Sequence, residues 1–95
     1  MTPRISLAST VVATREQVSS SVAEEEVILN LRDGAYYGLD AVGARAWRLI
    51  QEPRTLAEVC EAIASEYDVA PERCERDVVA LFRRLAERGL VEIKG

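Results

Sequence analysis

The chain carries few side chains of the kinds that perform catalysis or bind metals. It has two cysteines, Cys60 and Cys74, and no histidine. The commonest general base is therefore missing, and two thiols that do not form a C-x-x-C pair make a poor zinc site. Both cysteines fall at helical positions beside apolar residues, where a thiol behaves as a small hydrophobic side chain. We expect no catalytic residue, no metal, no cofactor and no enzymatic activity.

Charge and hydropathy argue against nucleic acids and membranes as partners of this protein. The 16 acidic residues outnumber the 12 basic ones, for a net charge of −4, whereas proteins that bind nucleic acids usually have a basic excess. No apolar run approaches the roughly 20 residues of a membrane span, and the N-terminus lacks the apolar region of a secretory signal. The acidic run Glu24-Glu25-Glu26 is predicted to be a solvated turn. These features predict a soluble, cytoplasmic protein that binds neither nucleic acid nor membrane.

The elements that must position any binding site fall into two halves of one domain. Residues 1–95 contain no linker and no internal repeat, which indicates a single domain. Residues 1–40 are β-rich, with short apolar signals at Ile5/Leu7, Val11/Val12 and Val18/Val22. Residues 41–90 have the apolar spacing of three helices, and Val91-Glu92-Ile93 could add a short final strand.

The clearest strand signal is a hairpin formed by residues 27–31 and 35–39. A three-residue loop, Arg32-Asp33-Gly34, places Gly34 at a left-handed position and pairs Leu31 with Ala35. The alternative is a two-residue Asp33-Gly34 turn, which buries less apolar surface. We expect the three-residue loop, because its register gathers the apolar residues on one face: Val27, Leu29, Leu31, Ala35, Tyr37 and Leu39.

Local signals mark the ends of the helices. Asp40 is the expected N-cap of the first helix, in which Val42, Ala46, Leu49 and Ile50 form the apolar face with Trp47 at its margin. Thr55 and Glu58 form a capping box at the start of the second helix. Pro71 suits the first turn of the third helix, which runs to Arg88 and is capped by Gly89. The expected fold is α+β and winged-helix-like, a three-stranded antiparallel sheet followed by a three-helix bundle.

The third helix has a wider apolar arc than packing on one neighbour requires. Its inward stripe is Cys74, Val78, Leu81, Phe82 and Leu85, and Val79 and Ala86 lie beside this stripe. Val79 either packs under the hairpin or lines a groove between the helix and the sheet. If residues 35–39 form the edge strand, Tyr36 and Gly38 direct their backbone groups outward and can pair with one more strand. The candidate peptide-binding residues are Ala35, Tyr36, Tyr37, Gly38, Leu39, Glu75, Val78, Val79, Phe82, Arg83 and Ala86.

These segments resemble the PqqD family over roughly residues 25–93. The similarity lies in residues 27–31, 34–40, Val42-Gly43, Trp47, Arg54-Thr55-Leu56, Val59 and Tyr67-Asp68-Val69. The resemblance implies a recognition element that binds the leader of a ribosomally made precursor peptide as an extra strand, between the third strand and the third helix. It is most similar to the stand-alone leader-binding component of lasso-peptide systems. The implied partners are the precursor's leader, a cysteine-protease-like leader peptidase and an ATP-dependent macrolactam synthetase.

Other functions stay open at this point. Within the family, the alternative is a peptide chaperone for a radical enzyme in pyrroloquinoline quinone assembly. A winged-helix DNA-binding protein would use residues 71–88 as its recognition helix, but arginines and acidic residues nearly balance there. The first 25 residues do not decide between these functions.

Overall fold

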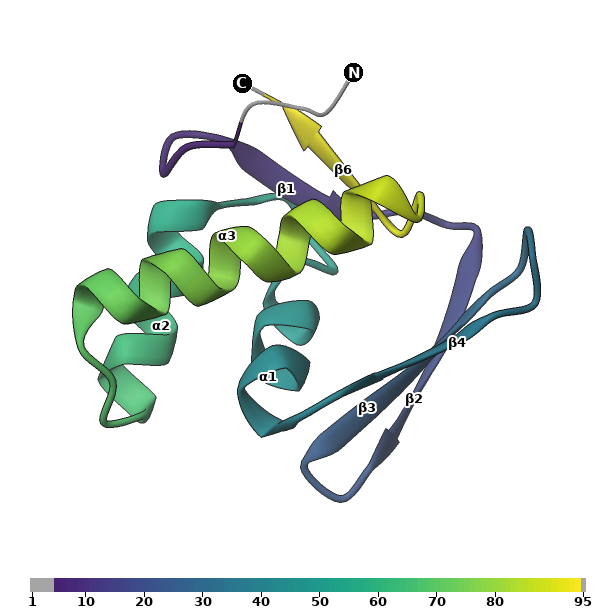
Figure 1. The fold of residues 1–95 in the computed structure, drawn as a ribbon, viewed down its shortest axis with the longest axis horizontal. Coiled ribbons are helices and arrows are strands. Elements are labelled where there is room, and N and C mark those ends of the chain that lie inside the picture. Colours follow the sequence, from purple (N-terminus) through teal and green to yellow (C-terminus); the bar gives the residue numbers. More distant parts are fainter. Residues whose placement is uncertain (1–4, 95) are drawn as a thin grey trace.

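The computed structural model describes residues 5–94, which form three helices and two small antiparallel sheets (Figure 1). The long third helix crosses the molecule, with one sheet on each side of it. In chain order the elements are β1 (Thr10–Ala13), β2 (Gln17–Val22), β3 (Glu25–Asn30), β4 (Tyr36–Leu39), α1 (Ala41–Leu49), β5 (Arg54–Thr55), α2 (Leu56–Glu66), α3 (Pro71–Glu87) and β6 (Val91–Lys94).

The first sheet joins the beginning and the end of the described chain. Its strand order is β5-β1-β6, and both neighbours run antiparallel to β1. Val11 is fully buried at the centre of this sheet, opposite Arg54 on one side and Ile93 on the other. The short final strand predicted at residues 91–93 is confirmed as β6, and the apolar signal at Ile5 and Leu7 lies outside any strand.

The second sheet has the order β2-β3-β4 and contains the predicted hairpin, but in a different register. Ile28 pairs with Tyr37, and Asn30 donates its N–H to the Ala35 carbonyl at 2.8 Å. The loop is therefore one residue longer than expected and spans residues 31–34, with Gly34 left-handed at φ +73° as predicted. The shift turns Glu26, Ile28 and Asn30 toward the core and leaves Leu31 56% exposed.

Two buried polar side chains explain why this register is favoured. Asn30 donates from Nδ2 to the Arg88 carbonyl at 2.9 Å, and its Oδ1 accepts the Arg32 N–H at 2.9 Å. Glu26 accepts from the Arg48 guanidinium at 3.1 Å and from the Ser21 hydroxyl at 2.8 Å. Buried polar groups are tolerated when they are paired in this way. The register was predicted from buried apolar surface alone, which takes no account of such hydrogen-bond partners. The predicted core face of β3, with Val27 and Leu29, was therefore wrong.

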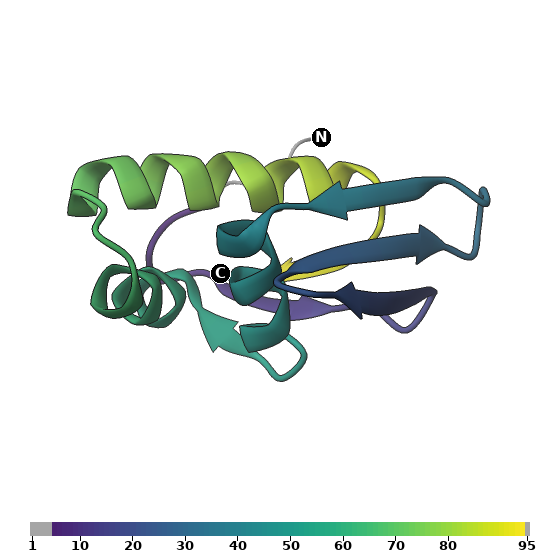
Figure 2. The same cartoon turned by 90° about the horizontal axis from the view of Figure 1, so that it is seen from below.

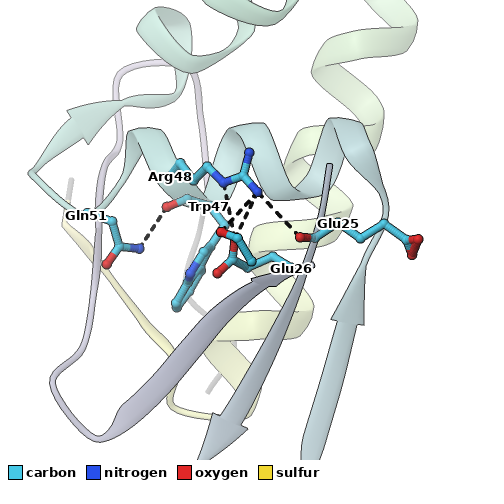
Figure 3. Close-up of polar contacts among 6 residues, drawn as sticks. Glu25, Glu26, Trp47, Arg48 and Gln51 are labelled. Carbon is cyan, nitrogen blue, oxygen red and sulfur yellow. Dashed lines mark hydrogen bonds and ion pairs between the residues drawn. The ribbon is translucent and has the colours of Figure 1, made fainter. Parts of the chain in front are cut away.

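The Glu26 contact also fastens α1 to the second sheet. Figure 3 shows the Arg48 side chain reaching from α1 to Glu26 and to the backbone carbonyl of Glu25, an Nη2–O distance of 3.4 Å. Just after the end of α1, the Gln51 amide donates to the Trp47 carbonyl at 2.9 Å. Glu26 is thus a buried member of β3, and the prediction that it belongs to a solvated turn was wrong.

The predicted helix caps are confirmed. Asp40 Oδ1 accepts the Gly43 N–H at 2.8 Å at the start of α1. Thr55 and Glu58 form the reciprocal capping box of α2, and the Thr55 N–H bond holds the pKa of the Glu58 carboxyl below its ordinary value. The left-handed Gly89 ends α3.

The residues after α3 complete a Schellman motif. The Gly89 N–H bonds the Ala86 carbonyl at 3.0 Å, and the Leu90 N–H bonds the Leu85 carbonyl at 2.9 Å. Leu90 is fully buried, as the prediction of a returning hydrophobic partner requires.

The core is shared by all three helices and both sheets. Trp47 is 1% exposed, so it belongs to the centre of the core and not to the margin of α1. The fold is mixed α/β, but the predicted order of strands followed by helices is not observed, because β5 lies between α1 and α2 and β6 follows α3. None of the helices in residues 5–94 is long and apolar enough to cross a membrane. The largest fully buried side chains are Trp47, Phe82, Ile28, Ile50, Leu56, Ile63 and Leu90.

Candidate functional site

One edge of β4 has no strand beside it in residues 5–94. The strand pairs only with β3, and Figure 2 shows β4 as the strand of its sheet nearest to α3. Because Ala35, Tyr37 and Leu39 lie opposite their hydrogen-bonded partners on β3, the intervening Tyr36 and Gly38 direct N–H and C=O toward the free edge. This agrees with the expected orientation, since moving the β3 register by one residue does not change which β4 residues face β3.

A cavity of about 620 Å³ lies where the last two residues of β4 and the start of α1 face α3, and we call it the β4–α3 groove. Gly38 and Leu39 form its β4 wall, and the start of α1 forms its floor. The turn before α3 closes one end. The larger aliphatic side chains that line the groove are Leu39, Val42, Val69, Val78 and Leu81.

The flank of α3 that faces the groove is the one that carries Leu81. Successive residues of a helix are about 100° apart, so Val79 and Leu81 are about 160° apart around the axis. Leu81 lines the groove, and Val79 therefore lies on the opposite flank, partly buried against the core. Glu75 and Arg83 share the Val79 flank. The expectation that Val79 borders the groove does not fit this helix orientation.

The other predicted residues divide by burial. Gly38, Leu39 and Val78 line the groove. Phe82 is fully buried in the core, and Ala86 lines a second, polar cavity at the end of α3. Tyr36 is 70% exposed and Tyr37 is half-buried, with the Arg88 guanidinium 5.9 Å from its ring centroid. Ala35 is half-buried just before the strand.

Several residues that line the groove are not among the residues predicted from the sequence, although the sequence carries a signal for some of them. Val42 and Leu81 were assigned to the core faces of their helices, although both are only partly buried. Val69 lies in the turn that was read only as a connection. The signal is that α3 has half-buried apolar residues on both flanks, Val79 on one and Leu81 on the other. Such a helix must be covered on both flanks, either by the rest of the protein or by a ligand. Which flank is open depends on tertiary packing.

The two cysteines lie between α2 and α3 and are free thiols. The Cys74 Sγ lies 3.8 Å from the Cys60 carbonyl. Burial raises the pKa of the Cys60 thiol to about 11 and also raises the pKa of Cys74. Both groups are therefore poor nucleophiles near neutral pH. Within residues 5–94, no group of three acidic or cysteine side chains is arranged to hold a metal ion.

Comparisons with known proteins agree on the family. The family model described as Coenzyme PQQ synthesis protein D (PqqD) matches residues 25–91. A solved structure described as TbiB1 in complex with the TbiA(beta) leader peptide is 40% identical, with a TM-score of 0.79, and the match covers 85% of this chain and 94% of that chain. A comparison with curated proteins finds no match.

A second solved structure, described as lasso peptide synthetase B1 complexed with the leader peptide, is 27% identical with a TM-score of 0.76. That match covers 86% of this chain and 96% of the other. Both similarities extend over nearly the whole of the solved chains, and the family model spans β3, β4 and all three helices. The expected resemblance to PqqD-like recognition elements is confirmed, and the chain belongs to the PqqD family.

Proposed function

We propose that this protein binds the leader segment of a ribosomally synthesised precursor peptide, of the lasso-peptide kind, as an additional strand on β4. The observation that carries the proposal is the free edge of β4 beside an apolar groove. Backbone bonds from Tyr36 and Gly38 would supply affinity that does not depend on sequence. Alternate side chains of the guest would enter the groove against Leu39, Val42 and Leu81, which supplies selectivity.

The solved neighbours support this proposal. Both are described as complexes with leader peptides, and one of them is described as a lasso peptide synthetase B1. We further propose that the bound leader is presented to a cysteine-protease-like leader peptidase and to a macrolactam synthetase. The protein itself supplies recognition only, because the pKa values of both cysteines are raised and the chain contains no histidine base.

The second candidate is a peptide chaperone for a radical enzyme, and the description of the matching family model favours it. The two candidates share the groove and differ in the enzymes that they serve. Neighbouring genes separate them: genes for a precursor, a peptidase and a synthetase indicate the lasso system, and a gene for a radical enzyme indicates the alternative.

The backbone part of the proposal is tested at Gly38. A Cβ at this position meets no atom within 4 Å, so Gly38→Ala is a matched control that keeps the N–H. Gly38→Pro removes the N–H that faces the guest. We expect calorimetry with the TbiA(beta) leader peptide to show binding at least tenfold weaker, about 1.4 kcal/mol, for Gly38→Pro and near-normal binding for Gly38→Ala.

The proposal that guest side chains enter the groove is tested by two separate variants, each of which places one carboxylate on one flank of α3. Leu81→Glu places a carboxylate inside the groove, and Val79→Glu places one on the opposite flank. Both variants are first checked for cooperative unfolding. We expect at least tenfold weaker binding for Leu81→Glu and little change for folded Val79→Glu, measured with the same peptide. Equal binding by wild type, Leu81→Glu and Gly38→Pro would exclude the β4–α3 groove as the site.

A further inference from the structure

The β4–α3 groove has unlike charges at its two ends. Asp40 and Asp68 line it where α1 begins and where the turn leads into α3. Farther along α3, Arg73 and Asp77 form an ion pair at 3.8 Å and largely offset one another. Arg84 lines the groove toward the hairpin end and has no ion-pair partner in residues 5–94. Asp33 and Glu87 line a neighbouring cavity near the hairpin, but neither forms an ion pair with Arg84, so its guanidinium is available to a guest.

A second guanidinium extends this end of the groove by one helical turn. Arg88 follows Arg84 by four residues, so the two side chains occupy neighbouring positions on one flank. The Arg88 guanidinium lies over the Tyr37 ring of β4. The backbone there is held in place, because the buried Asn30 amide bonds the Arg88 carbonyl at 2.9 Å. The spacing between the hairpin and the end of α3 is thereby fixed before any guest arrives.

We propose that the groove selects a guest that carries an acidic side chain at the hairpin end, where Arg84 binds it and sets the register of the added strand. This inference rests on the peptide-binding role proposed above. Backbone bonds along β4 are the same for every residue, so a guest held by them alone could slide by two residues and keep all of them. A carboxylate paired with a guanidinium makes charge-assisted, directional bonds that only one register allows.

Arg83 provides a matched control for Arg84. It lies on the opposite flank with Val79, about 160° from Leu81, and is exposed like Arg84. Neither arginine forms an ion pair in the described part of the chain. Arg83→Glu and Arg84→Glu therefore make the same change in net charge, and we expect both variants to fold. Arg84→Gln removes the positive charge without adding a negative one.

The experiment is a selection from a display library of random twelve-residue peptides by wild type, Arg83→Glu, Arg84→Glu and Arg84→Gln. We expect wild type and Arg83→Glu to enrich an acidic residue at a fixed distance from the apolar positions. Arg84→Gln should lose this preference, and Arg84→Glu should replace it by lysine or arginine. A synthetic peptide from the wild-type pool should bind Arg84→Glu at least tenfold more weakly and regain affinity when its acidic residue is changed to lysine.

The outcomes separate this inference from the proposed function. Enriched peptides without an acidic preference, or the same preference in wild type and Arg84→Glu, would overturn the assignment of Arg84 and leave the peptide-binding function standing. If none of the four proteins enriches any peptide, and none binds the TbiA(beta) leader peptide, the proposed function fails and this inference fails with it.

Discussion

At the scale of residues, the environment of the two cysteines makes a prediction about reactivity. Burial favours the neutral thiol, so the pKa of Cys60 rises to about 11 and that of Cys74 also rises. A folded pKa above the unfolded value means that this contribution to stability is complete below about pH 8.5, the ordinary cysteine value. It is lost as the pH rises toward the folded pKa.

We predict that iodoacetamide alkylates the native protein at pH 8 at least tenfold more slowly than the urea-unfolded protein, because the thiolate fraction is small. The native rate should increase steeply above pH 9. Mass spectrometry of wild type and of Cys60→Ala assigns the label to one thiol or the other. Equal native and unfolded rates at pH 8 would show that the thiols are exposed and ordinary.

Which single residues reach the site or the core depends on tertiary contacts that cannot be inferred from the local sequence. Val79 and Leu81 are both apolar and both half-buried on α3, and sequence spacing gives no reason to prefer one flank. Asn30 and Glu26 look like solvent-facing residues until Arg48 and the end of α3 provide their partners. The free edge of β4 could be predicted, whereas the flank of α3 that faces the cavity could not.

At the scale of elements, features that depend on a few neighbouring residues were predictable. The Asp40 cap, the Thr55–Glu58 capping box and the glycine at the end of α3 each use groups within four residues of each other. The hairpin register depends instead on contacts with α1 and α3, and the pairing of β1 with β6 joins residues about 80 positions apart in the chain. Such long-range pairings leave little local signal.

The turn between β2 and β3 supplies a prediction at this scale. Val22 pairs with Glu25, so the loop is Ala23-Glu24, and Ala23 has φ +58°. A left-handed conformation costs an alanine about 1–2 kcal/mol, and replacing the alanine by glycine removes this cost. The greater backbone freedom of glycine in the unfolded chain offsets part of the stability gained. We predict that Ala23→Gly raises the free energy of unfolding by about 0.5–1 kcal/mol, measured by urea denaturation.

The neighbouring position serves as the control for this turn. Glu24 lies outside the left-handed region, so Glu24→Gly relieves no strain and should leave stability unchanged or slightly lower. A loss of stability in Ala23→Gly as large as that in Glu24→Gly would contradict the assignment of strain to Ala23.

At the scale of the whole molecule, the folding unit is larger than the region matched by the family model. That match begins at residue 25, yet β1 forms the centre of the first sheet and buries Val11 completely. The segment before β1 also caps α2, since the carbonyls of Leu7 and Ser9 accept the N–H groups of Ala57 and Leu56, each at 3.0 Å. Residues 7–9, in the part of the chain whose role the sequence left undefined, therefore support the start of α2.

We predict that removing residues 1–14 lowers the free energy of unfolding by about 3 kcal/mol or more and leaves peptide binding intact in the folded fraction. The deletion removes Val11 from the core and leaves β5 and β6 without their shared partner. It also removes the Thr14 hydroxyl bond to the Gly89 carbonyl at 3.0 Å. The lost Val11 burial contributes about 1.5–3 kcal/mol, and each lost hydrogen bond about 1 kcal/mol.

Urea denaturation of the full chain and of the shortened chain measures the loss of stability. The control is Val18→Ala on β2, which should change stability little because Val18 is 55% exposed. Because β4, α1 and α3 form the groove without β1, calorimetry at low temperature should give the shortened chain nearly the full affinity for the TbiA(beta) leader peptide. A shortened chain as stable as the full one would show that β1 is dispensable. A folded but non-binding chain would show that the first sheet shapes the groove.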